Sequence, residues 1–555
     1  MSRLEIASPK RAKIVMEGLY KDLERRIESS PPGLCPVDMA RAFLELCHAQ
    51  TCGKCVPCRI GLGQLNNFIR EVLDGKATMK TLDIMEQTAL SIMESADCAI
   101  GYEAANMVYK GLIGYRDDYI EHIQNGRCTC TYNQPVPCVS LCPAHVDIPG
   151  YIALVGEGRY ADAIRLLRKD NPFPTTCGFI CEHPCEARCR RNMVDDSINI
   201  RGLKRVAADF AGEVDPPQCA PSTGKKIAIL GGGPGGLSAA YYLQLMGHQT
   251  TVYEMLPELG GMLRYGIPNY RLPKERLDDD IRAILKTGVQ VKNGLKIGQD
   301  ITIQELRQQY DVVLITIGAS TDKKLGLENE DADGIISAVQ FLRNVGKNQI
   351  IDLTGKEVVV IGGGNVSMDA VRTAKRLGAK KVSIVYRRRV ADMTALPGEI
   401  EGAVAEGIEL QTLKAPASID VDENHHVKGI YVTPQMVSSI RDGRASIKPT
   451  GEEDIYIPCD VLIVAIGQNI ETHHFEQAGI PVERGKIITK STGAFENLPG
   501  VFAGGDCASG PASVIKAIAA AKVVAANIDE YLGYHHEISC DVEIPEAHLD
   551  DRTPV

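Results

Sequence analysis

The chain has 555 residues, of which 44% are hydrophobic and 24% charged, a balance that excludes a mostly disordered protein and predicts several folded domains. Lysine and arginine number 61 against 71 aspartates and glutamates, so the net charge is −10 and no long basic run is present to bind a nucleic acid. The longest apolar runs, such as 312–317 and 461–466, are far shorter than the roughly 20 residues that span a bilayer, which argues against a membrane protein.

Residues 1–125 are predicted to form a helical domain with a metal site. Near the N-terminus, charges of both signs interrupt the apolar stretch that a signal peptide needs, so we expect a cytoplasmic protein. Residues 61–73 and 82–93 carry apolar side chains at helical spacing. Three close thiols precede these helices and a fourth thiol follows them, and together they suit a four-iron cluster: Cys52, Cys55, Cys58 and Cys98.

Residues 126–218 are predicted to form a second helical domain, with two clusters. Of the 18 cysteines, 14 lie at or before Cys189, and closely spaced thiols in a cytosolic chain are more often metal or redox ligands than disulfides. One helix is expected over 148–169, ending before Asn171 and Pro172. Eight thiols suffice for two four-iron clusters, and zinc is the alternative because spacing alone does not choose the metal. They are Cys128, Cys130, Cys138, Cys142, Cys177, Cys181, Cys185 and Cys189.

Beyond residue 225 the chain alternates short apolar strands with amphipathic helices, which is typical of parallel α/β sheets. A strand, a glycine-rich turn and a helix occur twice, with one turn beginning at Gly231 and the other at Gly362. We therefore predict a multidomain protein in which two α-helical iron–sulfur domains precede two nested α/β Rossmann-like nucleotide-binding domains. The expected boundaries are 219–340 and 468–535 for the two parts of the first nucleotide-binding domain, 341–467 for the second nucleotide-binding domain and 536–555 for a C-terminal tail.

The first glycine-rich turn has the pattern of a dinucleotide site. Gly231, Gly233 and Gly236 stand between an apolar strand and a helix, and Glu254 follows at the end of the next apolar stretch. Glycine permits the tight turn and the approach of a pyrophosphate to the helix N-terminus, and the acid accepts hydrogen bonds from a ribose hydroxyl. The alternative is a glycine-rich turn that binds no ligand.

The second turn predicts a site for NADP(H). A serine stands where a third glycine or alanine is usual, and it is small enough for the helix to pack on the strand. The next strand ends in arginines, where an NAD site would carry a carboxylate, and guanidinium groups suit a 2′-phosphate. The alternative is that these arginines form a solvated face or bind an acidic partner. The residues assigned to NADP(H) are Gly362, Gly364, Asn365, Ser367, Arg387 and Arg388.

The two modules together resemble the two-dinucleotide flavoprotein reductases. The stretch Gly504-Gly505-Asp506 is similar to their second flavin signature, and a helix follows it near Val514. Residues 260–274 resemble the stretch that lies along the flavin in glutamate synthase small subunits and their relatives. The resemblance thus implies FAD and adds to its expected ligands Gly261, Arg264, Gly266, Gly505, Asp506 and Val514.

The iron–sulfur segments carry resemblances of their own. Residues 126–218 are similar to the cluster domain shared by glutamate synthase small subunits, dihydropyrimidine dehydrogenase and the ferredoxin:NADP transhydrogenase large subunit. Two features depart from that pattern: the spacing of the first cysteines, and Lys204 where relatives supply a glutamine or glutamate ligand. An ammonium cannot coordinate iron, so either Cys177 substitutes or that cluster is altered or missing. Residues 40–125 resemble the cluster domain of the complex I NADH-binding flavoprotein subunit.

These resemblances predict an NADP-dependent flavin and iron–sulfur oxidoreductase that is one subunit of a hetero-oligomer and needs no general base. Its function is expected to be that of an NADH/ferredoxin:NADP transhydrogenase, with electron bifurcation as one form of it. The expected partner is an NADH-oxidising flavoprotein with clusters, or ferredoxin. Two alternatives stay open: a glutamate synthase NADPH small subunit, and an electron-relay subunit that does not turn over nicotinamide.

Overall fold

The structure, a computed structural model, describes residues 15–16, 18–20, 35–125, 136–187, 189–193, 195–349, 351–441 and 444–545. The chain divides into two compact units. We call Met1–Cys142 with His183–Ile200 the N-terminal unit, and Pro143–Glu182 with Arg201–Val555 the nucleotide unit. Within the described residues, every helix is too short or too polar to cross a bilayer.

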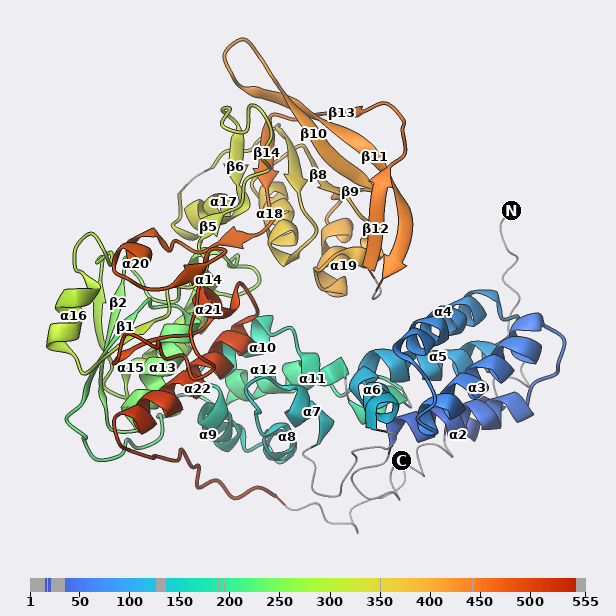
Figure 1. Ribbon diagram of the computed structural model, residues 1–555, viewed down its shortest axis with the longest axis horizontal. Helices are drawn as coiled ribbons and strands as arrows, with labels where there is room; N and C mark the ends of the chain where they lie inside the picture. The colour runs from blue at the N-terminus through green and yellow to red at the C-terminus, as the bar shows by residue number, and fades with distance from the viewer. Residues whose placement is uncertain are drawn as a thin grey trace. The chain divides into compact units, whose positions relative to one another are not determined.

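The N-terminal unit is helical (Figure 1). Helices predicted over 61–73 and 82–93 are present as α3 and α4, and Gly75 turns the chain between them with a φ of 67°. Their apolar faces pack around Phe43, Leu65 and Tyr119, which are completely buried. The helices are α2 Pro36–Ala49, a π-helical turn Pro57–Gly61, α3 Leu62–Leu73, α4 Met79–Ser95, α5 Ala99–Gly114, α6 Arg116–Asn125, α7 Pro137–Leu141, α11 Pro184–Ala187 and a 3₁₀ turn Arg190–Met193.

The nucleotide unit begins with helices that carry part of the cysteine-rich segment. The prediction of a single helix over 148–169 is wrong. The segment forms two helices, because Gly158 adopts a φ of 72° that a continuous helix cannot accommodate. Asp147 caps the first of them by accepting a hydrogen bond from the Gly150 backbone N–H at 3.0 Å. These helices are α8 Ile148–Gly156, α9 Tyr160–Asp170, α10 Pro174–Ile180 and α12 Ile200–Phe210.

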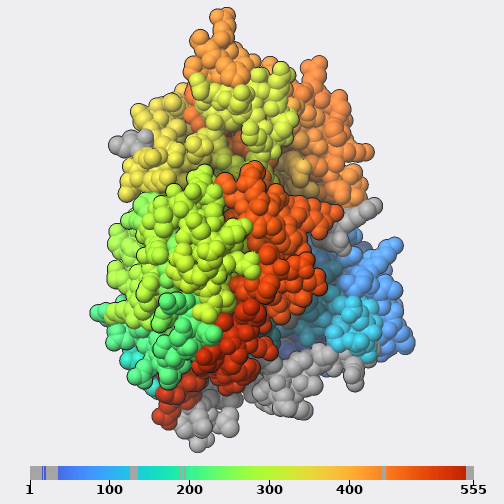
Figure 2. Space-filling view, turned by 60° about the vertical axis from the view of Figure 1, so that its left-hand side comes forward, coloured from blue at the N-terminus to red at the C-terminus, as the bar shows by residue number. Residues whose placement is uncertain are grey.

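The first parallel sheet has the strand order β18–β4–β1–β2–β3. The strand β18 comes long after β4 in the chain, yet the two pair in register, Val501 with Val313. Helix α22 packs along α13. In the space-filling view, the red residues near the C-terminus lie beside green residues from the first part of the nucleotide unit (Figure 2). The elements are β1 Lys226–Leu230, α13 Pro234–Leu245, β2 Gln249–Glu254, α14 Met262–Tyr265, α15 Lys274–Leu285, β3 Gln290–Asn293, α16 Ile303–Gln309, β4 Val312–Ile315, β18 Val501–Ala503, α21 Asp506–Ser509 and α22 Val514–Tyr531.

The second parallel sheet is formed by the segment that lies between β4 and β18 in the chain. Its strand order is β6–β14–β7–β8–β9, and β7 lies at its centre beside β8 and β14. Helix α18 packs on β7 and β8 and buries Met368 and Val371. The elements are β6 Ile335–Ser337, α17 Ala338–Gly346, β7 Glu357–Ile361, α18 Asn365–Arg376, β8 Lys381–Tyr386, α19 Pro397–Ala405, β9 Glu409–Thr412 and β14 Val461–Val464.

An antiparallel ribbon, which the sequence analysis did not predict, extends from the second sheet (Figure 1). Its strands β10 and β11 pair over most of their length, from Lys414 with Pro434 to Val421 with Val427. The ribbon consists of β10 Lys414–Val421, β11 Val427–Arg441, β12 Arg444–Pro449 and β13 Ile455–Pro458. Shorter elements are β5 Thr321–Asp322, β15 Gln468–Asn469, α20 His473–Gln477, β16 Val482–Glu483, β17 Lys486–Ile487 and a 3₁₀ turn Val390–Asp392.

Candidate cofactor sites

The first glycine-rich turn joins β1 to α13 and is closed by backbone contacts. Gly231 has a φ of 110°, and a Cβ there would lie 2.5 Å from the Thr316 carbonyl oxygen. A Cβ on Gly236 would lie 1.9 Å from the Gly231 carbonyl oxygen. Only glycine fits at positions 231 and 236. The turn therefore brings the start of α13 against β1, and the N–H groups at the start of α13 face the cavity above the sheet.

Glu254, at the end of β2, is buried and orders this turn. One carboxylate oxygen, Oε2, accepts the Gly232 backbone N–H at 2.7 Å, and the other, Oε1, accepts the Leu256 N–H at 2.8 Å. Burial raises the pKa of Glu254 above its ordinary value. Each oxygen keeps a second lone pair, so Glu254 can hold the turn and still accept a hydrogen bond from a ribose hydroxyl.

A cavity lies over the first turn and collects residues from distant parts of the chain. It is lined by Gly233, Glu254, Gly261 and the segment 504–506. Burial raises the pKa of Asp506 to about 6. A Cβ on Gly261 would lie 2.8 Å from the Gly233 Cα, so glycines on both sides keep this cleft open. The cavity therefore fits a dinucleotide such as FAD, with glycine backbone for its pyrophosphate and carboxylates for its hydroxyl groups.

The second turn repeats this geometry between β7 and α18. Gly362 has a φ of 144°, and a Cβ there would lie 2.3 Å from the Ala465 carbonyl oxygen. Asn365 begins α18, where its Oδ1 accepts the Leu396 backbone N–H at 3.0 Å. Ser367 is completely buried, and its Oγ has no hydrogen-bond partner among the described residues. The serine thus occupies the position of the third glycine and permits the close packing of helix on strand.

A cavity of about 890 Å³ opens beside this turn. Its walls include 362–364, Tyr386, Arg387 and Arg388. Arg388 is partly committed, because its Nε donates to the Ala445 carbonyl oxygen at 3.0 Å. Arg387 is exposed and makes no ion pair with a described residue, so its guanidinium is free to bind an anion.

The third arginine of this run does not belong to the cavity. Arg389 Nε donates to Asp392 Oδ2 at 2.8 Å, and this hydrogen bond lowers the pKa of Asp392 to about 2. Asp392 Oδ1 also accepts the Ala445 backbone N–H at 2.9 Å. The Arg389–Asp392 pair thus fixes the loop that presents Arg387 and Arg388.

The two nucleotide cavities meet at the start of α22. Ser513 and Lys516 line the cavity that contains Arg387, and Ala517, in the same helical turn, lines the cavity that contains Asp506. Val514 stands between them as the first residue of the helix and lines neither cavity. A nicotinamide ring bound in the larger cavity can therefore approach a flavin bound in the other, on the N-terminal side of α22.

The first group of cysteines in the N-terminal unit is brought together by a tight turn. Cys58 lies in the π-helical turn Pro57–Gly61, and Cys98 caps α5. Burial, with smaller contributions from the neighbouring Cys55, Cys98 and Cys52, raises the pKa of the Cys58 thiol to about 12. Four thiols that affect one another in this way fit a four-iron cluster.

The remaining cysteines are distributed over both units. In the N-terminal unit, α7 with Cys138 packs on α11 with Cys185, and burial raises the pKa of Cys138 with further contributions from Cys189 and Cys142. In the nucleotide unit, Cys177 and Cys181 lie one turn apart on and after α10. Cys128 and Cys130 lie outside the described residues. Among the described residues, four of the eight predicted ligands therefore lie in the N-terminal unit: Cys138, Cys142, Cys185 and Cys189.

Lys204 is buried in the nucleotide unit near Cys177. Its side chain lies over the Tyr151 ring, 6.0 Å from the centroid. Burial raises the pKa of Cys177 strongly, and the Lys204 ammonium acts against this. Lys204, which departs from the family pattern, therefore lies near Cys177, the thiol that we expect could substitute for the missing ligand.

Comparison with known proteins identifies the family. Residues 225–521, more than half of the chain, match the family model described as pyridine nucleotide-disulphide oxidoreductase. The chain belongs to this family. In this oxidoreductase, residues 38–122 also match the NADH-ubiquinone oxidoreductase-F iron–sulfur binding region. Residues 114–215 match dihydropyrimidine dehydrogenase domain II, which carries a 4Fe–4S cluster.

Several curated proteins are similar over most of the oxidoreductase. The NADP(+)-dependent formate dehydrogenase subunit beta of Moorella thermoacetica is 32% identical, over 89% of this chain and 79% of that protein. The NADPH-Fe(3+) oxidoreductase subunit beta of Geobacter sulfurreducens is 34% identical, over 90% and 79%. The glutamate synthase [NADPH] small chain of Escherichia coli is 34% identical, over 71% and 88%.

These matches confirm the predicted class of enzyme. The protein is an NADP-dependent flavin and iron–sulfur oxidoreductase, with FAD, NADP(H) and 4Fe–4S clusters as its cofactors. The resemblances to glutamate synthase small subunits and to the complex I flavoprotein are confirmed as well. The multidomain arrangement, with an iron–sulfur region before α/β nucleotide-binding sheets, agrees with the family.

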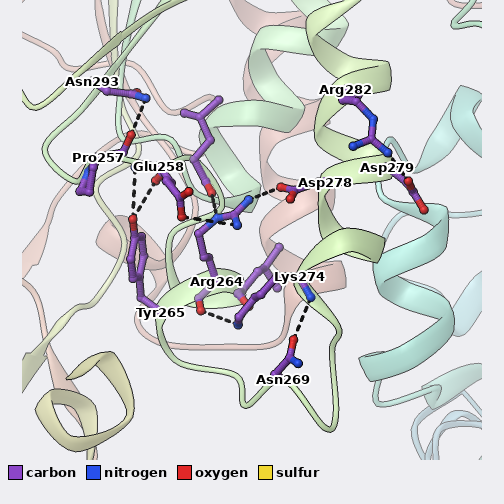
Figure 3. A network of polar contacts seen from close by, with 12 residues as sticks. Pro257, Glu258, Arg264, Tyr265, Asn269, Lys274, Asp278, Asp279, Arg282 and Asn293 are labelled. Atoms are coloured by element: carbon purple, nitrogen blue, oxygen red, sulfur yellow. Dashed lines mark hydrogen bonds and ion pairs between the residues drawn. The ribbon is translucent and has the colours of Figure 1, made fainter. Parts of the chain in front are cut away.

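Arg264, a predicted flavin ligand of the oxidoreductase, is buried and takes part in a network of polar contacts (Figure 3). Its Nε donates to the Leu259 carbonyl oxygen at 2.6 Å, and its guanidinium pairs with Asp278 and Glu258. Beside it, Lys274 Nζ donates to the carbonyl oxygens of Arg264 at 2.5 Å and Ile267 at 2.8 Å. Arg264 does not line the cavity that contains Asp506. We therefore assign Arg264 and Lys274 a structural role: they hold the loop that contains Gly261 and Gly266 in its conformation.

Replacing Lys274 by methionine should destabilise this loop. The lost hydrogen bonds leave buried carbonyl groups unsatisfied, and we expect the free energy of unfolding to fall by about 1–3 kcal/mol at neutral pH. Burial lowers the pKa of Lys274 to about 8, so the folded protein binds fewer protons than the unfolded chain between about pH 8 and 10.5, and stability should rise with pH there.

Urea unfolding at a series of pH values, followed by flavin fluorescence, measures both effects. Lys286→Met is the matched control, because Lys286 is exposed and makes only surface ion pairs with Glu213 and Asp215. Equal midpoints for the two variants, or the same pH dependence in Lys274→Met and wild type, would contradict the assignment.

The cluster site of the N-terminal unit has a glycine that can be tested in the same way. A Cβ on Gly101 would lie 2.5 Å from Cys58 Sγ, so Gly101→Ala should displace this thiol and reduce the iron content by about four atoms per chain. Gly63→Ala is the control, because its Cβ would only approach His48 at 3.9 Å. Iron analysis after anaerobic reconstitution decides: unchanged iron in Gly101→Ala would show that Cys58 holds no cluster.

Three residues that line the cavities carry no signature and were not predicted. Arg343, on α17, lines the cavity with Asp506 and donates from Nη2 to the Ser320 carbonyl oxygen at 2.6 Å. Glu182 lines the larger cavity and accepts from Asn365 Nδ2 at 3.3 Å. Lys516 lines the larger cavity from the first turn of α22. A lysine there opposes the helix dipole, and this unfavourable placement was the one signal that could have marked it.

Proposed function

We propose that the protein is the FAD- and NADP(H)-binding subunit of a cytoplasmic multi-subunit complex, in which hydride passes between NADP(H) and FAD and single electrons pass along the clusters. The observation that carries this proposal is the meeting of the two cavities at the start of α22, where Lys516 lines one and Ala517 the other. We assign the first sheet to FAD and the second, enclosed within it in the chain, to NADP(H), as two nested Rossmann-like domains.

The residues of the larger cavity hold NADP(H) in this proposal. Arg387 and Arg388 bind the 2′-phosphate, and the turn at Gly362 and Gly364 offers the N-terminus of α18 to the pyrophosphate. Asn365 stays in place through its contact with the Leu396 backbone N–H. The nicotinamide ring then extends toward Ser513 and Lys516, on the side where hydride must leave or arrive.

The residues of the other cavity orient FAD. The turn with Gly231, Gly233 and Gly236 donates backbone N–H groups to its pyrophosphate. Glu254 accepts a hydrogen bond from a ribose hydroxyl, and Asp506 accepts one from the ribityl chain. The N–H groups at the start of α22 face the ring system and favour negative charge there. When bound, FAD supplies the conversion between two-electron hydride chemistry and one-electron cluster chemistry.

The cluster sites define where partners exchange electrons. Cys52 is exposed, as are Lys54, Val56 and Ile60 beside it, so a cluster held there lies within reach of another protein. Relatives of this chain are named as beta or small subunits, which supports a hetero-oligomer. We propose an NADH-oxidising flavoprotein with clusters, or ferredoxin, as the partner.

The overall reaction we propose is that of an NADH/ferredoxin:NADP transhydrogenase. Electron bifurcation is the form in which the electrons of NADPH are divided between NAD⁺ and ferredoxin. A glutamate synthase small subunit is disfavoured because the small-chain relative matches only 71% of this chain, whereas residues 38–122 match a different iron–sulfur region.

Reconstitution tests the reaction. The holoprotein is mixed anaerobically with candidate partner subunits and NADP⁺, and NADPH formation is followed with NADH alone, with reduced ferredoxin alone and with both. A transhydrogenase that does not couple its partners should form NADPH with NADH alone or with reduced ferredoxin alone. A bifurcating enzyme, running in reverse in this assay, should form NADPH only when both donors are present. If no partner yields NADPH and NADPH does not reduce the bound flavin, the electron-relay alternative is supported. If NADPH reduces the flavin and an amidotransferase partner then forms glutamate, the glutamate synthase alternative is supported.

A further inference from the structure

A buried histidine–aspartate–histidine cluster lies in the nucleotide unit, away from both nucleotide cavities. His248 stands in the turn before β2, Asp529 near the end of α22, and His536 in the segment that follows α22. His248 Nε2 and His536 Nδ1 each lie 2.8 Å from Asp529 Oδ1. The three candidate ligand atoms lie within 4.8 Å of one another.

The surroundings fix each of the three groups. His248 is completely buried and Asp529 is 2% exposed. The backbone N–H of His536 donates to Asp529 Oδ2 at 2.7 Å, which holds that carboxylate by its other oxygen. The Tyr534 ring stacks on His536, with centroids 5.6 Å apart and an interplanar angle of 19°. The cluster is thus orientated by contacts outside its own ligand atoms, as ligands at metal sites commonly are.

The second nitrogen of His248 has a partner that suits a metal-binding tautomer. His248 Nδ1 lies 2.7 Å from Thr223 Oγ1, and that hydroxyl can itself donate to the Gly247 carbonyl oxygen at 3.2 Å. Thr223 can then accept a hydrogen bond from His248 Nδ1–H, which leaves the Nε2 lone pair directed at the Asp529 side. A neutral imidazole in this tautomer is a ligand for a divalent cation.

We propose that His248, Asp529 and His536 bind a divalent cation of the zinc class. Two imidazole nitrogens and one carboxylate oxygen are the donors that zinc takes at about 2.0–2.2 Å. Such bonds in a tetrahedral site place donor atoms about 3.3 Å apart, so the 2.8 Å contacts need to open only slightly. His536 is only partly buried, which leaves the fourth position to water. On binding, Nε2 of His248 and Nδ1 of His536 face the ion, and each ring keeps its proton on the other nitrogen.

The site would fasten the C-terminal segment to the first sheet. His248 directly precedes β2, whereas His536 lies beyond the last helix, so one ion would join parts of the chain that are far apart in sequence. Binding would stabilise the folded arrangement of this segment in proportion to the free ion concentration. The site involves neither the flavin nor the clusters and is independent of the proposed function.

Zinc content tests the site, with the neighbouring histidine as a matched control. The anaerobically reconstituted holoprotein is equilibrated with buffered zinc, and bound zinc is measured in wild type, His536→Gln, His248→Gln and His535→Gln. We expect wild type and His535→Gln to hold about one zinc per chain more than the other two variants, because His535 is exposed and outside the cluster. Zinc bound at cysteines cancels in this comparison.

Hydrogen exchange of the segment after α22 provides a second readout if His248→Gln fails to fold. In wild type, free zinc at ten times the dissociation constant should slow this exchange about tenfold, and His536→Gln should abolish the slowing. Equal zinc in all four proteins, or exchange that zinc does not change, would overturn the proposal and leave a hydrogen-bonded triad only.

Discussion

Gly236→Ala should abolish FAD binding while the chain still folds. A Cβ on Gly236 would lie 1.9 Å from the Gly231 carbonyl oxygen, a backbone atom that cannot move without opening the turn between β1 and α13. The helix N-terminus would then be displaced from the pyrophosphate position, and the tight turn would lose its register with Glu254. We expect the flavin content of the purified variant to fall to background after incubation with excess FAD.

The neighbouring Gly235 provides a matched control, because Gly235→Ala is the same glycine-to-alanine substitution one residue away. A Cβ on Gly235 would meet nothing within 4 Å, so Gly235→Ala should retain flavin close to the wild-type amount. The ratio of flavin to protein absorbance measures both, and circular dichroism checks that both variants fold. Full flavin in Gly236→Ala, or loss in both variants alike, would contradict the assignment of this turn.

Arg387→Ala should reduce the preference for NADPH over NADH by about 10–100-fold. Loss of a hydrogen bond to a charged group costs about 1.5–3 kcal/mol, and about 1.4 kcal/mol is a factor of ten. Arg387 lines the larger cavity and makes no ion pair with a described residue, so little else depends on it. The loss should appear in kcat/KM for NADPH, with kcat/KM for NADH and flavin content nearly unchanged.

An arginine on the same domain, but outside the cavity, serves as the control. Arg376, at the end of α18, pairs with Glu406 at 2.8 Å and should not affect the ratio when replaced by alanine. Steady-state reduction of an artificial acceptor by each nucleotide measures the ratio. If Arg387→Ala retains the wild-type preference, the 2′-phosphate is bound elsewhere, and Arg388 and Lys516 become the residues to test.

The parts of the fold that local sequence determines were predictable. The apolar strands β1 and β7 are each followed by a glycine that must adopt a positive φ, Gly231 at 110° and Gly362 at 144°, and this combination leaves few alternatives. The grouping of Cys52, Cys55 and Cys58 followed from their spacing. The break between the two helices at Gly158 could also have been predicted, since two glycines stand at 156 and 158. We predicted one helix because apolar residues continue at helical spacing on both sides of these glycines.

The parts that depend on long-range contacts were not predictable. The ribbon of β10 and β11 is built from mixed polar and apolar residues and includes Pro416 and Pro434, so neither strand carries the apolar run of a buried strand. Arg264 looked like a flavin ligand from its neighbours in sequence, but its direction is set by Asp278 on α15. The approach of Ala517 to one cavity and Lys516 to the other depends on how α22 packs, which no local pattern specifies.

The central claim is that NADPH reduces FAD within this chain and that the electrons continue to its clusters. Anaerobic titration of the reconstituted protein with NADPH, and separately with NADH, while flavin and cluster absorbance are recorded, tests it most directly. We predict that NADPH bleaches the flavin near stoichiometric amounts and then the clusters, and that NADH does so only at much higher concentration. Bleaching by NADH at the lower concentration, or by neither nucleotide, would contradict the account.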